Sequence, residues 1–144
     1  MNASRTLFSI IAFATALALP TSAAEAVDSH SKGAKPAHIS GGQEFKLTDY
    51  LVPGKTTVFD FYSDYCPPCR AIGPYVEKLH ENRSDVAVVE VNINRPGIDR
   101  IDWQSPVAKQ YRLESIPHFI VFGPEGKLKA EGEPAYQLVV GWLN

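Results

Sequence analysis

The two cysteines of this 144-residue sequence stand three positions apart, as Cys66-Pro67-Pro68-Cys69. A disulfide that braces a small secreted protein closes a long loop, whereas a pair at this spacing closes almost none. Two chemistries fit such a pair, namely thiol–disulfide exchange or half of a soft-metal site. Zinc would need two further ligands, and the sequence has no second Cys-x-x-Cys and no paired histidines. We therefore expect redox chemistry, with no metal and no other cofactor.

The two sulfurs are predicted to divide the reaction between them. A thiolate attacks a disulfide, so the attacking cysteine needs a setting that favours its anion. A helix is predicted from Pro67 to Asn82, and its free N–H groups and dipole favour a thiolate at Cys66. We expect Cys66, nearer the helix end and solvent, to attack, and Cys69, one turn further in, to resolve the mixed disulfide.

The elements around this pair alternate between strand and helix. β-Branched and aromatic residues predict buried strands, and an apolar period of about 3.6 residues predicts helices. The expected strands are Glu44–Leu47, Thr56–Tyr62, Val86–Asn92, His118–Phe122 and Lys127–Glu131, and the helical segments are Thr48–Leu51, Pro67–Asn82, Ser105–Tyr111 and Ala135–Leu143. A β-α-β half followed by a β-β-α half predicts an α/β fold with one central mixed sheet flanked by helices. The cysteines then follow a buried strand, at the edge of the sheet where α/β sites gather.

Asp60 lies six residues before Cys66, and Pro74 lies five residues after Cys69, inside the predicted helix. Ile116-Pro117 precedes the predicted strand His118–Phe122, and Gly126 lies in the turn after that strand. On these positions, the segment from Asp60 to Arg70 resembles the active-site segment of the thioredoxin family, which keeps a buried Asp, a Pro that kinks the helix, a loop that faces the cysteines and a hairpin Gly at the matching places. The resemblance covers Val58 to Gly132 and implies a thioredoxin-like fold.

The resemblance also implies roles for individual residues. Pro117 would be cis and would expose the Ile116 backbone for pairing with a substrate chain. Asp60 would act as the proton acceptor for Cys69, with a merely structural buried acid as the alternative. Independently of the resemblance, the aromatic side chains of Tyr65 and Trp103 are candidates for a substrate platform, with ordinary packing as the alternative.

Two features depart from the family pattern. Glu90 stands where thioredoxins place a Lys near the buried Asp, so a second carboxylate there would raise one pKa, unless Glu90 points to a solvated edge. The segment Asn94–Gln104 is longer than in ordinary thioredoxin, and we interpret it as an extended loop beside the active-site face.

His118 follows Pro117 and is either an ordinary strand residue or a group that acts near the cysteines.

The N-terminus has the three parts of a secretory signal peptide. A charged start precedes the apolar run Leu7–Leu19 and small residues that allow cleavage after Ala23 or Ala24. The alternative is a retained membrane anchor, although the run is short for a spanning helix. We predict a signal peptide over residues 1–24, a flexible leader over 25–38 and the folded domain over 39–144. The protein would then be exported, to the periplasm if the source is bacterial.

The formal net charge of −2, with 14 basic against 16 acidic residues and no basic run, gives no sign of nucleic-acid binding. The expected substrates are protein or peptide disulfides, and an unidentified redox partner must recycle the cysteines. Strongly oxidising relatives carry His where this chain has Pro68, so we expect the reducing direction, acting on exported proteins. A disulfide oxidase or isomerase, or a dithiol metal chaperone, remains an alternative.

Overall fold

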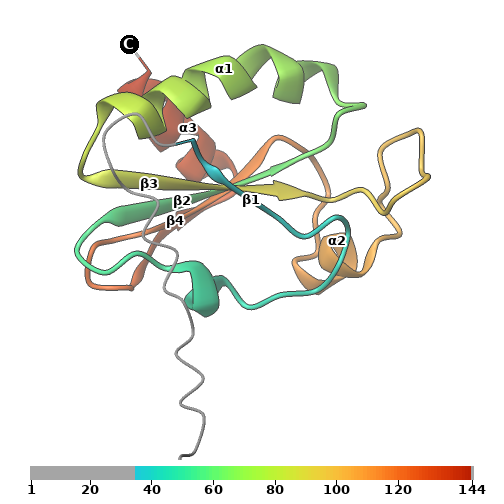
Figure 1. Ribbon diagram of the computed structural model, residues 1–144, viewed down its shortest axis with the longest axis horizontal. Coiled ribbons are helices and arrows are strands. Elements are labelled where there is room, and N and C mark those ends of the chain that lie inside the picture. The colour runs from blue at the N-terminus through green and yellow to red at the C-terminus, as the bar shows by residue number, and fades with distance from the viewer. Residues whose placement is uncertain (1–34, 144) are drawn as a thin grey trace, which may run out of the picture.

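A five-stranded sheet with helices on both faces runs through residues 35–143, the part of the chain that the computed structural model describes (Figure 1). The strand order is β1-β3-β2-β4-β5. In chain order the elements are β1 (Ala37–Ile39), the 3₁₀ turn η1 (Leu47–Tyr50), β2 (Thr56–Tyr62), α1 (Pro67–Asn82), β3 (Val86–Asn92), α2 (Pro106–Gln110), β4 (His118–Phe122), β5 (Leu128–Glu131) and α3 (Glu133–Trp142). The predicted α/β class, the mixed sheet and the three central strands are confirmed. The predicted signal peptide lies outside the described residues.

The sheet is parallel on one side and antiparallel on the other. β1 and β2 both run parallel to β3, while β4 runs antiparallel to β2 and to β5. β2 and β3 pair without a shift, from Thr56 opposite Val86 to Tyr62 opposite Asn92. Their carboxyl ends therefore meet at one edge of the sheet, and the cysteine pair follows that edge.

Each face of the sheet has its own apolar core. α1 and α3 cover one face, where Val58, Val88 and Phe119 are buried. α2 and η1 lie on the opposite side in Figure 1, where Phe59 and Phe61 are fully buried. Residues in both central strands are buried on both faces, and this explains their nearly continuous apolar sequences.

The helices begin where the sequence supplies caps. Ser105 Oγ accepts a hydrogen bond from the Ala108 N–H at 3.2 Å, and Pro106 occupies the first position of α2. Cys66 is the N-cap of α1, two prolines fill the first turn, and Pro74 lies inside the helix. No helix within residues 35–143 is long and apolar enough to cross a bilayer.

One prediction about the N-terminal part is wrong. Glu44–Leu47 is not a strand, because the side chain of Gln110 takes the place of a neighbouring strand: its Nε2 donates to the Phe45 carbonyl at 2.8 Å and its Oε1 accepts from the Phe45 N–H at 3.1 Å. Ala37 and His38, which the predicted leader over 25–38 included, lie in β1 and pair with the free edge of β3. Residues 25–34 of that leader lie outside the described part.

Candidate active site

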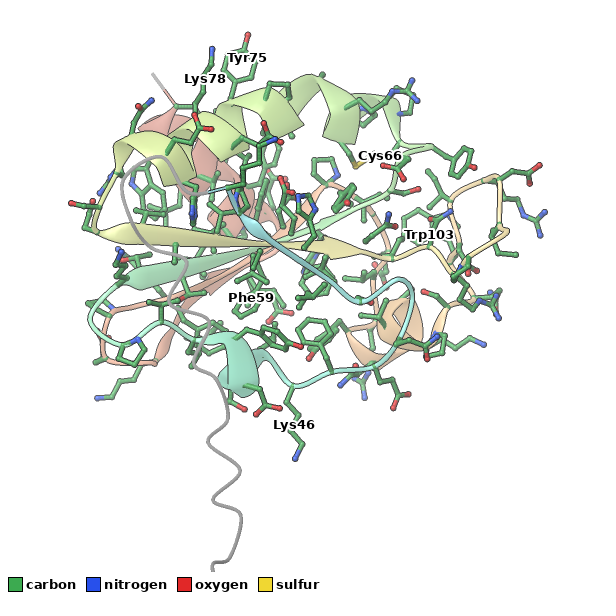
Figure 2. The ribbon with its side chains drawn as sticks, viewed as in Figure 1. Lys46, Phe59, Cys66, Tyr75, Lys78 and Trp103 are labelled. Carbon is green, nitrogen blue, oxygen red and sulfur yellow. A yellow bond between two sulfur atoms is a disulfide. The ribbon has the colours of Figure 1, made fainter. Side chains whose placement is uncertain are left out.

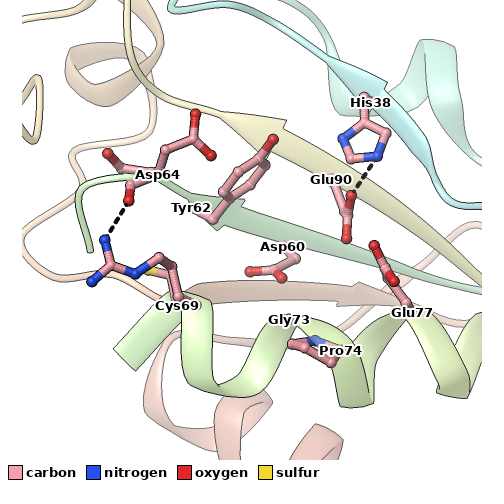
Figure 3. Close-up of a pocket in the computed structure, with 11 residues that line it drawn as sticks. His38, Asp60, Tyr62, Asp64, Cys69, Gly73, Pro74, Glu77 and Glu90 are labelled. Atoms are coloured by element: carbon pink, nitrogen blue, oxygen red, sulfur yellow. Dashed lines mark hydrogen bonds and ion pairs between the residues drawn. The ribbon is translucent and has the colours of Figure 1, made fainter. Parts of the chain in front are cut away.

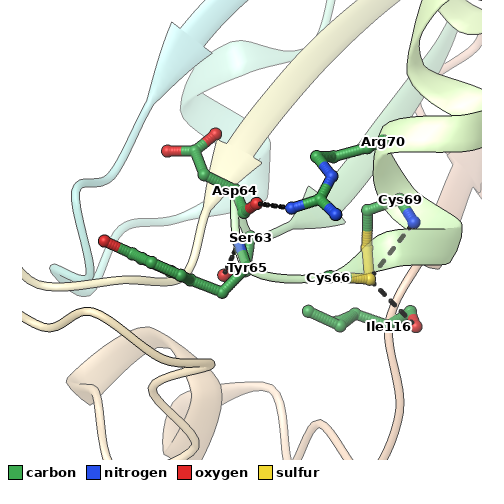
Figure 4. Close-up of a disulfide and its surroundings, with 7 residues drawn as sticks. All are labelled: Ser63, Asp64, Tyr65, Cys66, Cys69, Arg70 and Ile116. Carbon is green, nitrogen blue, oxygen red and sulfur yellow. Dashed lines mark hydrogen bonds between the residues drawn. A yellow bond between two sulfur atoms is a disulfide. The ribbon is translucent and has the colours of Figure 1, made fainter.

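Cys66 and Cys69 form a disulfide at the start of α1, with their Cα atoms 5.3 Å apart (Figure 4). The Cys69 N–H donates to Cys66 Sγ at 3.2 Å, so the N-terminus of the helix provides a donor to the first sulfur. Pro67 and Pro68 have no N–H to offer. The Arg70 N–H donates to the Cys66 carbonyl at 3.1 Å rather than to the sulfur.

Exposure does not separate the two cysteines, contrary to the prediction that Cys66 lies nearer to solvent. Cys66 is 1% exposed and Cys69 is 4% exposed. Cys66 is covered because its Sγ lies 3.6 Å from the Ile116 carbonyl oxygen (Figure 4). What distinguishes the two residues is their surroundings: Cys66 faces the loop before β4, and Cys69 lines a pocket beneath α1.

The loop before β4 has the geometry that the resemblance implied. The Ile116–Pro117 peptide bond is cis, which confirms that prediction. Tyr65, directly before Cys66, is 44% exposed, and Trp103 is 37% exposed. Figure 2 shows Trp103 toward the same end of the molecule as Cys66. Both aromatic side chains are therefore accessible, as a substrate platform would require.

A pocket of about 300 Å³ lies between α1 and the sheet (Figure 3). The residues that line it come from β1, β2, β3, α1 and the loop between β2 and α1, and they are His38, Asp60, Tyr62, Ser63, Asp64, Cys69, Arg70, Gly73, Pro74, Glu77 and Glu90. Four of them are carboxylic acids and one is the second cysteine. The structure thus brings Asp60 and Cys69 to one cavity, as predicted.

Asp60 is a buried acid with an incomplete hydrogen-bond environment. Its side chain lies on β2, the residue is 3% exposed, and its Oδ1 has no hydrogen-bond partner within the described residues. Burial, and to a lesser degree the negative charge of Glu90, raises the pKa of Asp60 to about 8. A carboxyl group that titrates near neutral pH can accept a proton and give it back.

Glu90 does not point to a solvated edge. It pairs with Asp60 across β2 and β3, and it is 6% exposed. Its carboxylate lies 2.8 Å from Nε2 of His38, whose side chain is 56% exposed (Figure 3). Burial and the nearby Glu77 raise the pKa of Glu90, while His38 opposes that rise.

The sequence held a signal for the pairing of Asp60 with Glu90 that our reasoning did not use. Each acid is the fifth residue of a seven-residue strand, so an unshifted parallel pairing must place them side by side. His38 carried no such signal, because it lies in a three-residue strand without a pattern.

His118 is not brought into this pocket. Its ring packs edge-on against Phe61, 5.9 Å between centroids, and so belongs to the opposite face of the sheet from Asp60. Burial lowers the pKa of His118, and its Nε2 lies 3.9 Å from the Glu131 carboxylate. Its surroundings are those of a packed strand residue.

The segment Asn94–Gln104 forms a loop held by its own side chains. Asp102 is 4% exposed and accepts hydrogen bonds from Arg95 Nε at 2.6 Å and from the Gln104 N–H at 3.2 Å. Asn94 Nδ2 donates to the Arg100 carbonyl at 2.6 Å. The loop therefore has a defined conformation that presents Trp103. Within residues 35–143 no group of three His, Cys, Asp or Glu side chains is arranged to hold a metal ion.

Comparison with known proteins agrees with this geometry. The family model described as Thioredoxin matches residues 42–139. The chain is 30% identical over 91 residues to the thioredoxin of Mycoplasmoides gallisepticum, covering 63% of this chain and 80% of that protein. It is 32% identical over 85 residues to the thiol:disulfide interchange protein TxlA homolog of Synechocystis, and 34% identical over 76 residues to the chloroplastic thioredoxin-like protein HCF164 of Arabidopsis thaliana. Those two matches cover 59% and 53% of this chain, but only 44% and 27% of the relatives.

Solved structures show the same fold. A mutant thioredoxin from Halobacterium salinarum superposes with a TM-score of 0.53 at 20% identity, covering 79% of this chain and 96% of that one. A cysteine pair at a helix start, set beside a mixed sheet of this topology, defines a thiol–disulfide oxidoreductase. The chain belongs to the thioredoxin family.

Proposed function

We propose that this oxidoreductase works in the reducing direction, transferring electrons from the Cys66–Cys69 dithiol to disulfides of protein clients. The observation that carries the proposal is the donor set of Cys66, whose sulfur accepts the Cys69 N–H while Pro67 and Pro68 offer none. A weakly stabilised thiolate makes the reduced form less favourable, and this lowers the reduction potential. The carboxylates of the adjoining pocket act in the same direction, because negative charge disfavours a nearby thiolate.

The reaction would begin with attack by Cys66. Its thiolate attacks one sulfur of the client disulfide, forming a mixed disulfide and releasing the other client sulfur as a thiolate. Cys69 then loses its proton to the Asp60 carboxylate and attacks Cys66 Sγ, which releases the second client thiolate. The dithiol is oxidised by two electrons and the client disulfide is reduced by two. The backbone at Ile116, before the cis bond, supplies an edge on which an extended client segment can pair.

The reduction potential tests the direction. We expect a value below about −200 mV when the protein is equilibrated with glutathione buffers and the disulfide fraction is measured. Pro68→His should move the potential toward the oxidising side, because an imidazolium would stabilise the Cys66 thiolate. Pro68→Ala, which restores an N–H without an imidazole, is the matched control. A wild-type potential near about −120 mV would contradict the reductase and favour an oxidase.

We also propose that the protein is exported, on the strength of the signal-like segment at residues 1–24. An exported dithiol needs a partner that returns electrons to it. A complex of ferredoxin:thioredoxin reductase with thioredoxin f2 has been solved, and a chain of that complex shares the fold of this protein, with a TM-score of 0.54 at 17% identity. That complex is an example, in another protein, of a reductase bound to a thioredoxin. Mass spectrometry of the native protein should find a chain that begins near Ala24 or Glu25, whereas retention of Leu7 would indicate an anchor.

A further inference from the structure

Three neighbouring strands place an imidazole and two carboxylates in one row across the sheet. His38 on β1 is opposite Glu90 on β3, and Glu90 is opposite Asp60 on β2. All three side chains line the pocket beneath α1 that also contains Cys69 (Figure 3). The row thus leads from the second cysteine, through two buried acids, to a side chain that is 56% exposed.

We propose that Glu90 and His38 are positioning residues that set the proton affinity of Asp60, and thereby the pH at which Cys69 can give up or take back its proton. Glu90 holds the proton on Asp60, since two adjacent buried carboxylates cannot both ionise easily. His38 acts through Glu90: its ring nitrogen, 2.8 Å from the carboxylate, stabilises the Glu90 anion and so preserves the negative charge that holds the proton on Asp60.

The other charged groups of the pocket do not take this role. Arg70 donates through Nη1 to the Asp64 backbone carbonyl at 2.9 Å, which directs its guanidinium to the loop before α1. Glu77 of α1 adds a third negative charge that opposes ionisation of Glu90. His80 of α1 does not line the pocket, and its Nδ1 accepts the Val88 N–H at 2.9 Å, so that ring nitrogen is already engaged. Among the described residues, the ion pair with His38 is therefore the contact that stabilises the Glu90 anion.

One proton leaves the dithiol in each cycle. A Cys66 thiolate and a Cys69 thiol react with one client disulfide to give the Cys66–Cys69 disulfide, two client thiolates and one proton. Asp60 receives that proton from Cys69, and it must lose it to solvent before the next cycle. The reverse reaction requires a protonated Asp60. The inference rests on the dithiol chemistry and holds for either direction, so its failure would not affect the reductase proposal.

Titration of the unmodified, oxidised full chain is the first test. The ¹³C shifts of the carboxyl carbons of Asp60 and Glu90 are followed against pH by NMR. We expect the Asp60 curve to show its main step in the mildly alkaline range, after Glu90 has lost its proton, and a smaller step where Glu90 titrates. An Asp60 carboxyl that ionises before Glu90, or an Asp60 curve without the smaller step, would overturn the inference, and this measurement needs no variant to fold.

Variants make the test quantitative. Glu90→Gln keeps the shape and removes the charge, and it should lower the Asp60 midpoint by about one pH unit or more. His38→Phe keeps a ring beside Tyr62 but removes the donor, and it should lower the midpoint by a smaller amount, because Glu90 then holds its negative charge less readily. In the Glu90→Gln background His38→Phe should change nothing, because His38 acts only through Glu90.

The pH profile for reduction of the disulfide by dithiothreitol should move in the same directions as the Asp60 midpoint. Glu81→Gln, which removes the same charge from α1 one turn beyond Glu77 and outside the pocket, should leave both readouts unchanged. An unshifted midpoint in Glu90→Gln, or an equal His38→Phe shift with and without Glu90, would refute the proposal.

Discussion

The two cysteines have different neighbours, and so different expected roles, although both are buried in the disulfide form. Cys66 accepts the N–H of Cys69 at the end of α1, whereas Cys69 lines the pocket that holds Asp60. We therefore expect Cys66→Ser to abolish disulfide reduction and Cys69→Ser to accumulate a mixed disulfide with the client. Reductase assays and non-reducing gels with mass spectrometry would measure both effects. Equal trapping by the two variants would contradict the assignment.

Asp60 should make stability depend on pH. Its carboxyl group keeps its proton in the folded state up to about pH 8, whereas in the unfolded chain it loses the proton near its ordinary pKa of 3.8. The folded state thus binds more protons between these values, and stability falls as pH rises through that window. Asp60→Asn should remove this fall, making the variant more stable than wild type above about pH 8 by up to several kcal/mol.

Urea unfolding of the oxidised proteins across this pH range would measure the difference. The exposed Asp99→Asn is the control and should leave the slope of stability against pH unchanged. Parallel curves for wild type and Asp60→Asn would show that burial does not hold the proton on Asp60.

Among the elements, the Asn94–Gln104 loop depends most on one side chain. Asp102 accepts hydrogen bonds from the Arg95 side chain and from the N–H groups of Arg95 and Gln104. Asp102→Asn should destabilise the fold by about 1–3 kcal/mol, because the donors of Arg95 and Gln104 lose the charge of a buried acceptor. It should also speed amide hydrogen exchange across residues 95–104.

A second Arg–Asp pair supplies the matched comparison. Arg83 and Asp85 also form two side-chain hydrogen bonds, but the Asp85 side chain is 64% exposed. Asp85→Asn should therefore change the free energy of unfolding by less than about 1 kcal/mol. If both variants cost the same, the burial of Asp102 is not what stabilises the loop.

The elements also show where sequence reasoning succeeds. Thr56–Tyr62, Val86–Asn92 and His118–Phe122 were predicted to the residue, because strands buried on both faces have a long apolar signal bounded by turn residues. The same approach failed at Glu44–Leu47, where the partner is a Gln110 side chain far away in the sequence. It also failed at β1, since a three-residue strand depends on the free edge of β3 rather than on its own residues.

At the scale of the whole molecule, the strand order and register of the sheet determine which titratable side chains lie next to one another. The class of fold, the cysteine pair and the buried Asp60 could all be predicted from local spacing. The ion pair of His38 with Glu90 could not, because it requires a chain segment 52 residues away to add a parallel strand at a particular register. The part of the site that departs most from the family pattern is thus the part that only the assembled sheet reveals.

The direction of β1 has a practical consequence for attaching the protein to a surface. β1 runs parallel to β2 and β3, and the cysteines follow the carboxyl end of β2, so the described chain enters the sheet from the amino-terminal side of the strands. A tag, bead or fusion partner joined ahead of β1 would leave the dithiol directed outward, toward arriving clients. An immobilised reagent built on this domain is therefore best coupled through its N-terminal side.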